Sequence, residues 1–168
     1  MILATALMAA SPMIAHAQSS ESHERARASL PASEGAHNIV YYGIRNYKSK
    51  KFLQPAYEID AVGARIVQEA EAPTWYQSWN DILDGGYWSF ENMGSRKNLG
   101  ISGGSTAHGA IAIQANPAGD LNQDWEIRYG VHPYPAGIFV LVNRRSGLCL
   151  GISNASIENG AQAAPVPL

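Results

Sequence analysis

Carboxylates are the side chains through which this chain could most directly perform acid–base chemistry. Two pairs of aspartates lie close together in the sequence, Asp81 with Asp84 and Asp120 with Asp124, and a pair of carboxylates is what a glycoside hydrolase uses. Both pairs fall in turn-rich stretches, where aspartate is common because its side chain stabilises turns. The sequence therefore favours a structural role for these residues, and we expect no catalytic residue.

Charge and residue spacing exclude several other classes of function. The five histidines are dispersed, and no spacing predicts a metal site. Neither a phosphate-binding glycine loop nor a serine nucleophile elbow is found. The 12 basic and 14 acidic residues are scattered and give a net charge of −2, unlike the basic surface of a nucleic-acid-binding or membrane-binding protein. We therefore expect a binding protein without cofactor, metal, nucleic-acid partner or membrane partner.

One pattern of residues recurs three times along the chain. In each copy a glycine follows an asparagine by 17 residues, and the first two copies continue to a Gln-x-Trp triplet at matching spacings. The members are Asn46, Ser49, Leu53, Gly63, Gln68, Gln77 and Trp79; Asn92, Ser95, Leu99, Gly109, Gln114, Gln123 and Trp125; and Asn143, Ser146, Leu150 and Gly160. Such a repeat predicts three structural units, about 39–84, 85–130 and 136–168, of which the third is incomplete.

Each unit contains short runs with the alternating pattern of half-buried β-strands. The predicted strands lie at 40–45, 65–68 and 79–83, at 87–91, 111–114 and 125–129, and at 138–142 and 161–164, with further short strands around Leu53, Leu99 and Leu150. No stretch has a sustained helical period. We therefore expect an all-β domain of eleven strands, with the last strand of the third unit missing.

These repeats resemble the ricin-type β-trefoil lectins over residues 39–168. The resemblance rests on Leu-Gly-Ile-Ser at 99–102 and again at 150–153, and on Asn122-Gln123-Asp124-Trp125. It implies a β-trefoil in which Trp79, Trp125 and the leucines Leu53, Leu99 and Leu150 form the core, while Gln77 and Gln123 tie loops. Asp81 stands where the second copy has Ile127, and an acid at an inward position predicts a shifted strand register there.

The resemblance also implies three sugar-contacting positions in each unit, and this chain fills few of them. The position of an aspartate holds Gln54, Gly100 and Gly151, and the position of an aromatic residue holds Glu69, Ala115 and Val166. The asparagine before Gln-x-Trp occurs once, as Asn122, where the first copy has Tyr76. The predicted carbohydrate-binding residues are Asn122 with Gln114, Asn116, Asp120 and the nearby His108, together with Tyr76 or Trp75 as a displaced stacking platform.

The N-terminal 17 residues carry no charged side chain and end in Ala15-His16-Ala17, which matches a signal-peptidase site. We expect a signal peptide at 1–17, a disordered polar leader at 18–38 and a secreted protein. A buried N-terminal helix is the alternative. The apolar run from Met1 to Ala10 is too short to cross a bilayer as a helix.

Two features near the C-terminus lead to further expectations. Cys149, the single cysteine, is either a free or intermolecularly paired thiol or a small buried apolar residue. Without a fourth strand in the third unit, the first strand at 40–45 becomes an exposed edge, which favours aggregation.

The sequence as a whole predicts a secreted carbohydrate-binding module that recognises a polysaccharide or glycoconjugate. The alternative is a β-trefoil scaffold without sugar binding that acts through protein–protein contact, as an inhibitor or adhesion module. The absence of most of the expected sugar-contacting residues keeps this alternative open.

Overall fold

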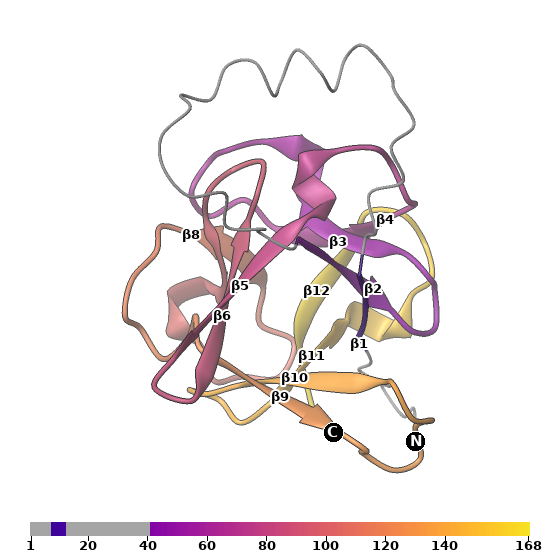
Figure 1. The fold of residues 1–168 in the computed structure, drawn as a ribbon. Helices are drawn as coiled ribbons and strands as arrows, with labels where there is room; N and C mark the ends of the chain where they lie inside the picture. Colours follow the sequence, from indigo (N-terminus) through magenta and orange to yellow (C-terminus); the bar gives the residue numbers. More distant parts are fainter. Residues whose placement is uncertain (1–7, 13–40) are drawn as a thin grey trace, which may run out of the picture.

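The computed structural model describes residues 8–12 and 41–168, and this part of the chain is built from strands (Figure 1). The strands are β1 (Met8–Pro12), β2 (Tyr42–Asn46), β3 (Phe52–Pro55), β4 (Ile66–Glu69), β5 (Trp79–Asp84), β6 (Tyr87–Asn92), β7 (Asn98–Ile101), β8 (Ala112–Ala115), β9 (Trp125–Tyr129), β10 (Phe139–Asn143), β11 (Cys149–Ile152) and β12 (Ala161–Val166). Four 3-10 helices of three residues each join them: η1 (Ala56–Glu58), η2 (Trp75–Gln77), η3 (Ser102–Gly104) and η4 (Ser153–Ala155). The predicted cleavage site at 15–17 and the leader at 18–38 lie outside the described residues.

The strands follow the three predicted units. The first unit contains β2 to β5, the second β6 to β9 and the third β10 to β12, so the third unit has three strands of its own. All strands join one hydrogen-bonded sheet, in which β5 pairs with β6 and β9 pairs with β10 where one unit passes to the next. The predicted all-β fold and its eleven strands after residue 40 are confirmed.

The repeated asparagine and serine form the turn that follows the first strand of each unit. The side-chain oxygen of Asn46 accepts hydrogen bonds from the backbone N–H groups of Lys48 and Ser49, at 2.9 and 3.0 Å. Asn92 and Asn143 accept equivalent bonds from the N–H groups three residues later, at 3.1 and 3.2 Å. An asparagine side chain stabilises a turn in this way, so the spacing of the repeat encodes local geometry.

The repeated tryptophans and leucines lie in the core, as predicted. Trp79 and Trp125 are fully buried, and their indole N–H groups donate to the carbonyl oxygens of Leu53 and Leu99 at 3.0 and 3.1 Å. Leu150 is buried at the equivalent place in the third unit. These hydrogen bonds satisfy the one polar group that each tryptophan carries into the interior.

The glutamines of the Gln-x-Trp triplets tie the preceding loops to the barrel. The Gln77 amide donates to the carbonyl of Ala70 at 2.8 Å and its oxygen accepts from the N–H of Ala72 at 2.9 Å. Gln123 makes the matching pair of bonds with Asn116 and Ala118, at 2.9 and 3.2 Å. The structural role predicted for both glutamines is confirmed.

The predicted register shift at Asp81 is wrong. Trp79 pairs with Asn92 and Asp81 with Phe90, in the same register as Trp125 with Asn143 and Ile127 with Leu141. Asp81 is only partly buried, and the residues that follow it in β5 are exposed. Water therefore reaches the carboxylate, and the strand has no reason to slip.

The predicted exposed edge at the first strand of the barrel is also wrong. β2 pairs with β1 along five residues, from Met8 opposite Asn46 to Pro12 opposite Tyr42. Residues 8–12 thus form a strand within the segment expected to be a signal peptide, and they are not helical as in the alternative. The edge of β2 that was expected to be exposed is therefore paired with β1 of the same chain.

Cys149 is a free thiol and, as in the second interpretation, a small buried apolar residue. Its side chain is 1% exposed and lies in a small apolar cluster with Val140, Val142 and Val166. Burial raises the pKa of the Cys149 thiol above its ordinary value, because the interior disfavours the thiolate. The residue behaves as a small hydrophobic side chain.

Candidate functional site

An exposed aromatic side chain marks one face of the first unit. Trp75 begins η2 and is 51% exposed. The ring of Tyr41 meets the Trp75 ring edge to face, with centroids 5.7 Å apart and an interplanar angle of 83°. Thr74 caps η2 by accepting a hydrogen bond from the N–H of Tyr76 at 3.3 Å. The indole is therefore held in place while much of its surface faces solvent.

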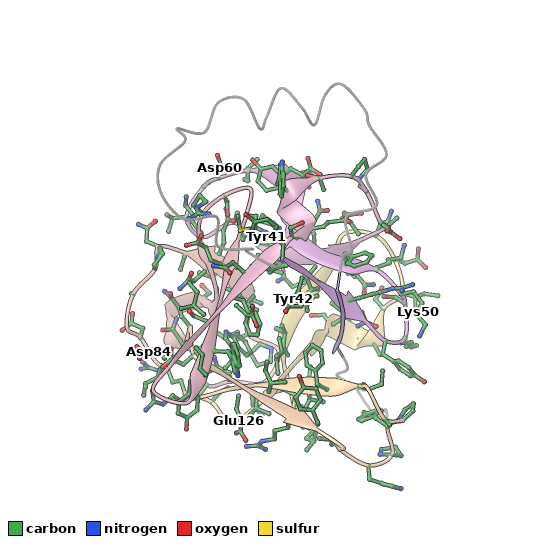
Figure 2. The ribbon with its side chains drawn as sticks, in the orientation of Figure 1. Tyr41, Tyr42, Lys50, Asp60, Asp84 and Glu126 are labelled. Atoms are coloured by element: carbon green, nitrogen blue, oxygen red, sulfur yellow. The ribbon has the colours of Figure 1, made fainter. Side chains whose placement is uncertain are left out.

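Tyr76, the residue after Trp75, is joined to an acidic loop of the same unit. Its hydroxyl donates to Oδ1 of Asp60 at 2.8 Å, and this bond, followed by desolvation, raises the pKa of the Tyr76 phenol. A Cβ added at Gly94 would lie 2.7 Å from the Tyr76 ring, so the ring packs directly on that glycine. We call Tyr41, Asp60, Trp75 and Tyr76 the aromatic cluster. In Figure 2, Asp60 and Tyr41 lie toward the opposite end of the molecule from Asp84 and Glu126.

Sequence reasoning missed Tyr57, which lies on the same loop as Asp60. Tyr57 is 91% exposed and has a φ of 60°, and Glu58 follows with a φ of 53°. The second unit places Gly103 and Gly104 at the corresponding positions, each with a φ of 60°. The third unit has Asn154 and Ala155 there, with φ values of 55° and 50°, so the left-handed turn belongs to the repeat, and Tyr57 is distinguished by its bulk and exposure at a position where such a residue is uncommon. The comparison with the two glycines was the signal that could have revealed it.

Tyr57 stands at the rim of a cavity of about 400 Å³. The cavity is lined mainly by the first unit, including Ala56, Arg65, Val67 and Glu69, and Gly160 of the third unit also lines it. Arg65 is exposed and Glu69 is partly buried. The cavity therefore offers a cationic and an anionic side chain beside an exposed tyrosine.

The predicted polar site of the second unit is a surface loop in which Asn122 is engaged in the fold. Asn116 and Asp120 are exposed. Asn122 is partly buried, and its amide donates to the carbonyl of Ile101 at 3.1 Å. A Cβ added at Gly100 would meet Gln123 at 3.1 Å, so this site has no room for a larger side chain without a shift. His108 is exposed on a separate turn.

Gln114 does not face solvent, contrary to the sequence-based expectation. Its side chain is fully buried, and its amide donates to the carbonyls of Ile59 and Ala61 at 2.7 and 2.8 Å. Gln68 makes the same two contacts with the third unit, through the carbonyls of Ser156 and Glu158 at 3.0 Å. Both glutamines therefore link neighbouring units.

One member of the aspartate pairs, Asp124, takes part in a side-chain ion pair. Asp124 accepts a hydrogen bond from Arg144 at 3.0 Å, and the same guanidinium lies 4.1 Å from the ring centroid of Tyr87. Within the described residues, no group of three or more His, Cys, Asp and Glu side chains could hold a metal ion. The helices in that part of the chain are also too short to cross a membrane.

Comparisons with known structures agree with this architecture. The chain matches the designed threefold symmetric protein ThreeFoil with a TM-score of 0.70 and 29% identity, over 76% of this chain and 89% of that one. It matches the exo-β-1,3-galactanase 1,3Gal43A from Clostridium thermocellum with a TM-score of 0.71 and 24% identity, over 81% of this chain and 29% of that one. The agglutinin of Rhizoctonia solani matches with a TM-score of 0.65 and 15% identity, over 83% of this chain and 91% of that one.

The sequence comparisons identify the family. No curated protein matches the chain. The family model described as ricin-type beta-trefoil lectin domain-like matches residues 29–114 and 74–164, which together span most of the chain. The threefold repeat, the buried Gln-x-Trp tryptophans and this match agree, and the chain belongs to the ricin-type β-trefoil lectin-like family.

Proposed function

We propose that this protein is a secreted carbohydrate-binding module that recognises a polysaccharide or glycoconjugate through the aromatic cluster of its first unit. Membership of a lectin-like family supports the general class of function. The observation that carries the proposed site is the half-exposed indole of Trp75, which precedes Tyr76 in the sequence, while the hydroxyl of Tyr76 donates to the exposed carboxylate of Asp60.

The chemistry of the cluster suits a sugar. A pyranose ring has an apolar face that packs on a flat aromatic surface, and aromatic contacts of this kind bury a large area. Sugar hydroxyls donate strong hydrogen bonds to a carboxylate. Asp60 uses Oδ1 to accept from Tyr76, and its second oxygen remains for a ligand. Because Tyr41 already orients the Trp75 ring, little conformational freedom is lost on binding.

The polar loop of the second unit is the second candidate contact surface. Asn116 and Asp120 are exposed there, and Asn122 lies behind them. Asn122 would have to release the carbonyl of Ile101 before it could bind a ligand. We therefore propose this loop as the weaker of the two surfaces.

A glycan array with the full chain tests the proposal, followed by titration of any bound glycan. Trp75→Ala is expected to weaken binding by about tenfold or more, because a stacking platform is lost. Tyr129→Ala is the matched control, since Tyr129 is also an exposed aromatic residue, 70% exposed, but lies on β9. Loss of binding only in Asn122→Ala would place the site in the second unit. Unchanged affinity in both variants would overturn the proposed sites.

An absence of binding across a broad array would favour the alternative, a β-trefoil scaffold that acts through protein–protein contact. One observation supports keeping this alternative. Gln54 stands at the position where the resemblance implies an aspartate, and its side chain is buried and accepts a hydrogen bond from Gln77 at 2.8 Å. That position is therefore not free to hold a sugar.

Secretion is proposed separately, from the Ala15-His16-Ala17 sequence alone. N-terminal sequencing of protein recovered from the medium is expected to begin at Gln18. Intact protein starting at Met1 in the cell interior would contradict secretion without affecting the carbohydrate-binding proposal.

A further inference from the structure

The strands that carry Gln-x-Trp occupy a defined place in the barrel. β5 begins at Trp79, which pairs with Tyr42 in the first strand of its own unit and with Asn92 in the first strand of the next. β9 begins at Trp125, which makes the equivalent pairs with Trp88 and Asn143. Each of these strands therefore lies between the first strands of two consecutive units.

β1 occupies the corresponding place between the third unit and the first. Met8 pairs with Phe139 in β10 and with Asn46 in β2. Phe139 precedes Asn143 by four residues, as Tyr42 precedes Asn46 and as Trp88 precedes Asn92. Met8 therefore pairs with the first strands of two units, at the same two positions at which Trp79 and Trp125 pair with theirs.

The rest of the ladder follows the same register. Ala10 lies opposite Ile44, two residues before the repeated turn asparagine. Asp81 lies opposite Phe90 and Ile127 lies opposite Leu141 at the equivalent step. All three ladders are antiparallel, so the direction of β1 also agrees with that of β5 and β9.

We infer that the seam between β2 and β10 is a strand-acceptor site whose occupant is Met8–Pro12 of the same chain, bound as the fourth strand of the third unit. Figure 1 shows β1, in indigo, running beside β2 toward the orange β10. The site recognises an extended backbone through ladder hydrogen bonds, with Met8 at the register position of the tryptophan.

Two physical features favour this occupant. β1 pairs with both β2 and β10, so an unoccupied seam would expose two strand edges. Pro12 lies opposite Tyr42, so the segment that connects β1 to β2 starts and ends at neighbouring positions. The entropic cost of closing such a connection grows only slowly with its length, so the length of the connection does not prevent this pairing.

The assignment has a consequence for processing. Cleavage after Ala17 would remove β1 and open the acceptor seam, whereas the uncleaved chain keeps the barrel closed. The inference concerns the uncleaved chain and depends neither on secretion nor on sugar binding.

Cysteine cross-linking in the full chain tests the register directly. Ala9 lies opposite Arg45, and opposite residues of antiparallel strands have Cα atoms about 4.5–5.5 Å apart, within the range of a disulfide. In a Cys149→Ala background, Ala9→Cys with Arg45→Cys is expected to form an intramolecular disulfide on mild oxidation. The control pair is Ala9→Cys with Asp84→Cys, because Asp84 is exposed on the distant β5–β6 hairpin (Figure 2).

Non-reducing electrophoresis and peptide mass mapping give the readout. A monomeric product that links positions 9 and 45, with none in the control pair, would support the inference. A disulfide-linked dimer would show that a second copy supplies the strand and would overturn the assignment to the same chain. Equal cross-linking in both pairs, or none in either, would also overturn it.

A peptide experiment provides an independent measurement. Removal of residues 1–17 is expected to lower the Tm by on the order of 10 °C, as the loss of a few kcal/mol would in a domain of this size. A synthetic peptide of residues 6–13 should restore the Tm in proportion to its concentration, because it binds only the folded state, whereas a scrambled peptide should not. An unchanged Tm after the deletion, or equal effects of both peptides, would refute strand acceptance.

Discussion

Gln114 offers the sharpest test of how the units are held together. Its buried amide donates two hydrogen bonds to backbone carbonyls of the first unit, at Ile59 and Ala61. Gln114→Met removes both donors while the side chain keeps a similar length and volume. The substitution therefore separates the hydrogen bonds from packing.

The expected loss follows from the two contacts. A protein hydrogen bond contributes about 0.5–1.5 kcal/mol net, so two bonds contribute about 1–3 kcal/mol. The carbonyls of Ile59 and Ala61 belong to exposed residues, and water can partly replace the lost donors. We therefore expect a loss within that range rather than the larger penalty of two carbonyls left unpaired in the interior.

Urea denaturation followed by tryptophan fluorescence measures this loss. Asn116→Ala is the control, because Asn116 is exposed two residues further along the chain and should change the free energy of unfolding by less than about 0.5 kcal/mol. Glycan affinity should be unaffected in folded Gln114→Met protein. A change in stability no larger than that of the control, or a selective loss of glycan binding, would refute the linking role of Gln114.

Three further predictions concern packing, reactivity and pH. Gly43→Ala should destabilise the fold by about 1–3 kcal/mol, because the new Cβ would lie 2.5 Å from the buried ring of Phe52; a thermal melt equal to wild type would contradict this close packing. The Cys149 thiol should react with a thiol reagent at pH 8 only when denaturant is added, because it is buried and its pKa is raised; rapid reaction in buffer would contradict its burial. Tyr76→Phe should lower stability by up to about 1 kcal/mol near neutral pH, through loss of the bond to Asp60. Because the folded-state pKa of Tyr76 is raised from 10.0, its contribution is complete below about pH 10 and is lost as the pH rises through the raised value; a difference between the two proteins that grows with alkaline pH would contradict this reasoning.

Much of the barrel could be predicted because the residues that form its turns and strands lie close together in the sequence. The asparagine of each repeat forms a turn with residues two and three positions away, and alternating runs define strands within the same stretch of chain. Trp79 and Trp125 could be placed in the core because the resemblance to the ricin-type β-trefoil lectins, which the Gln-x-Trp repeat carries, implies it, and both are buried. Spacing within a repeat can be read from the sequence without knowing which distant residues lie nearby in the fold.

The candidate site was less predictable, since exposure depends on neighbours that are distant in sequence. Trp75 lies against Tyr41, and Tyr76 bonds to Asp60 sixteen residues earlier. Gln114 lay beside the predicted polar residues in sequence, yet its side chain turns inward to the first unit. The order of residues in the sequence does not show whether such a side chain points into the fold or toward solvent.

The sequence by itself determined three β-rich units, their turns, their tryptophan core and their resemblance to a lectin-like family. Only the tertiary structure decided what completes the third unit. The pairing of Met8 with Asn46 and Phe139 joins residues that no repeat relates. A strand edge accepts any extended segment with matching length and direction, because its hydrogen bonds come from the backbone and carry no side-chain code. Which segment occupies the seam between β2 and β10 therefore depends on which part of the chain the tertiary structure places beside these two strands.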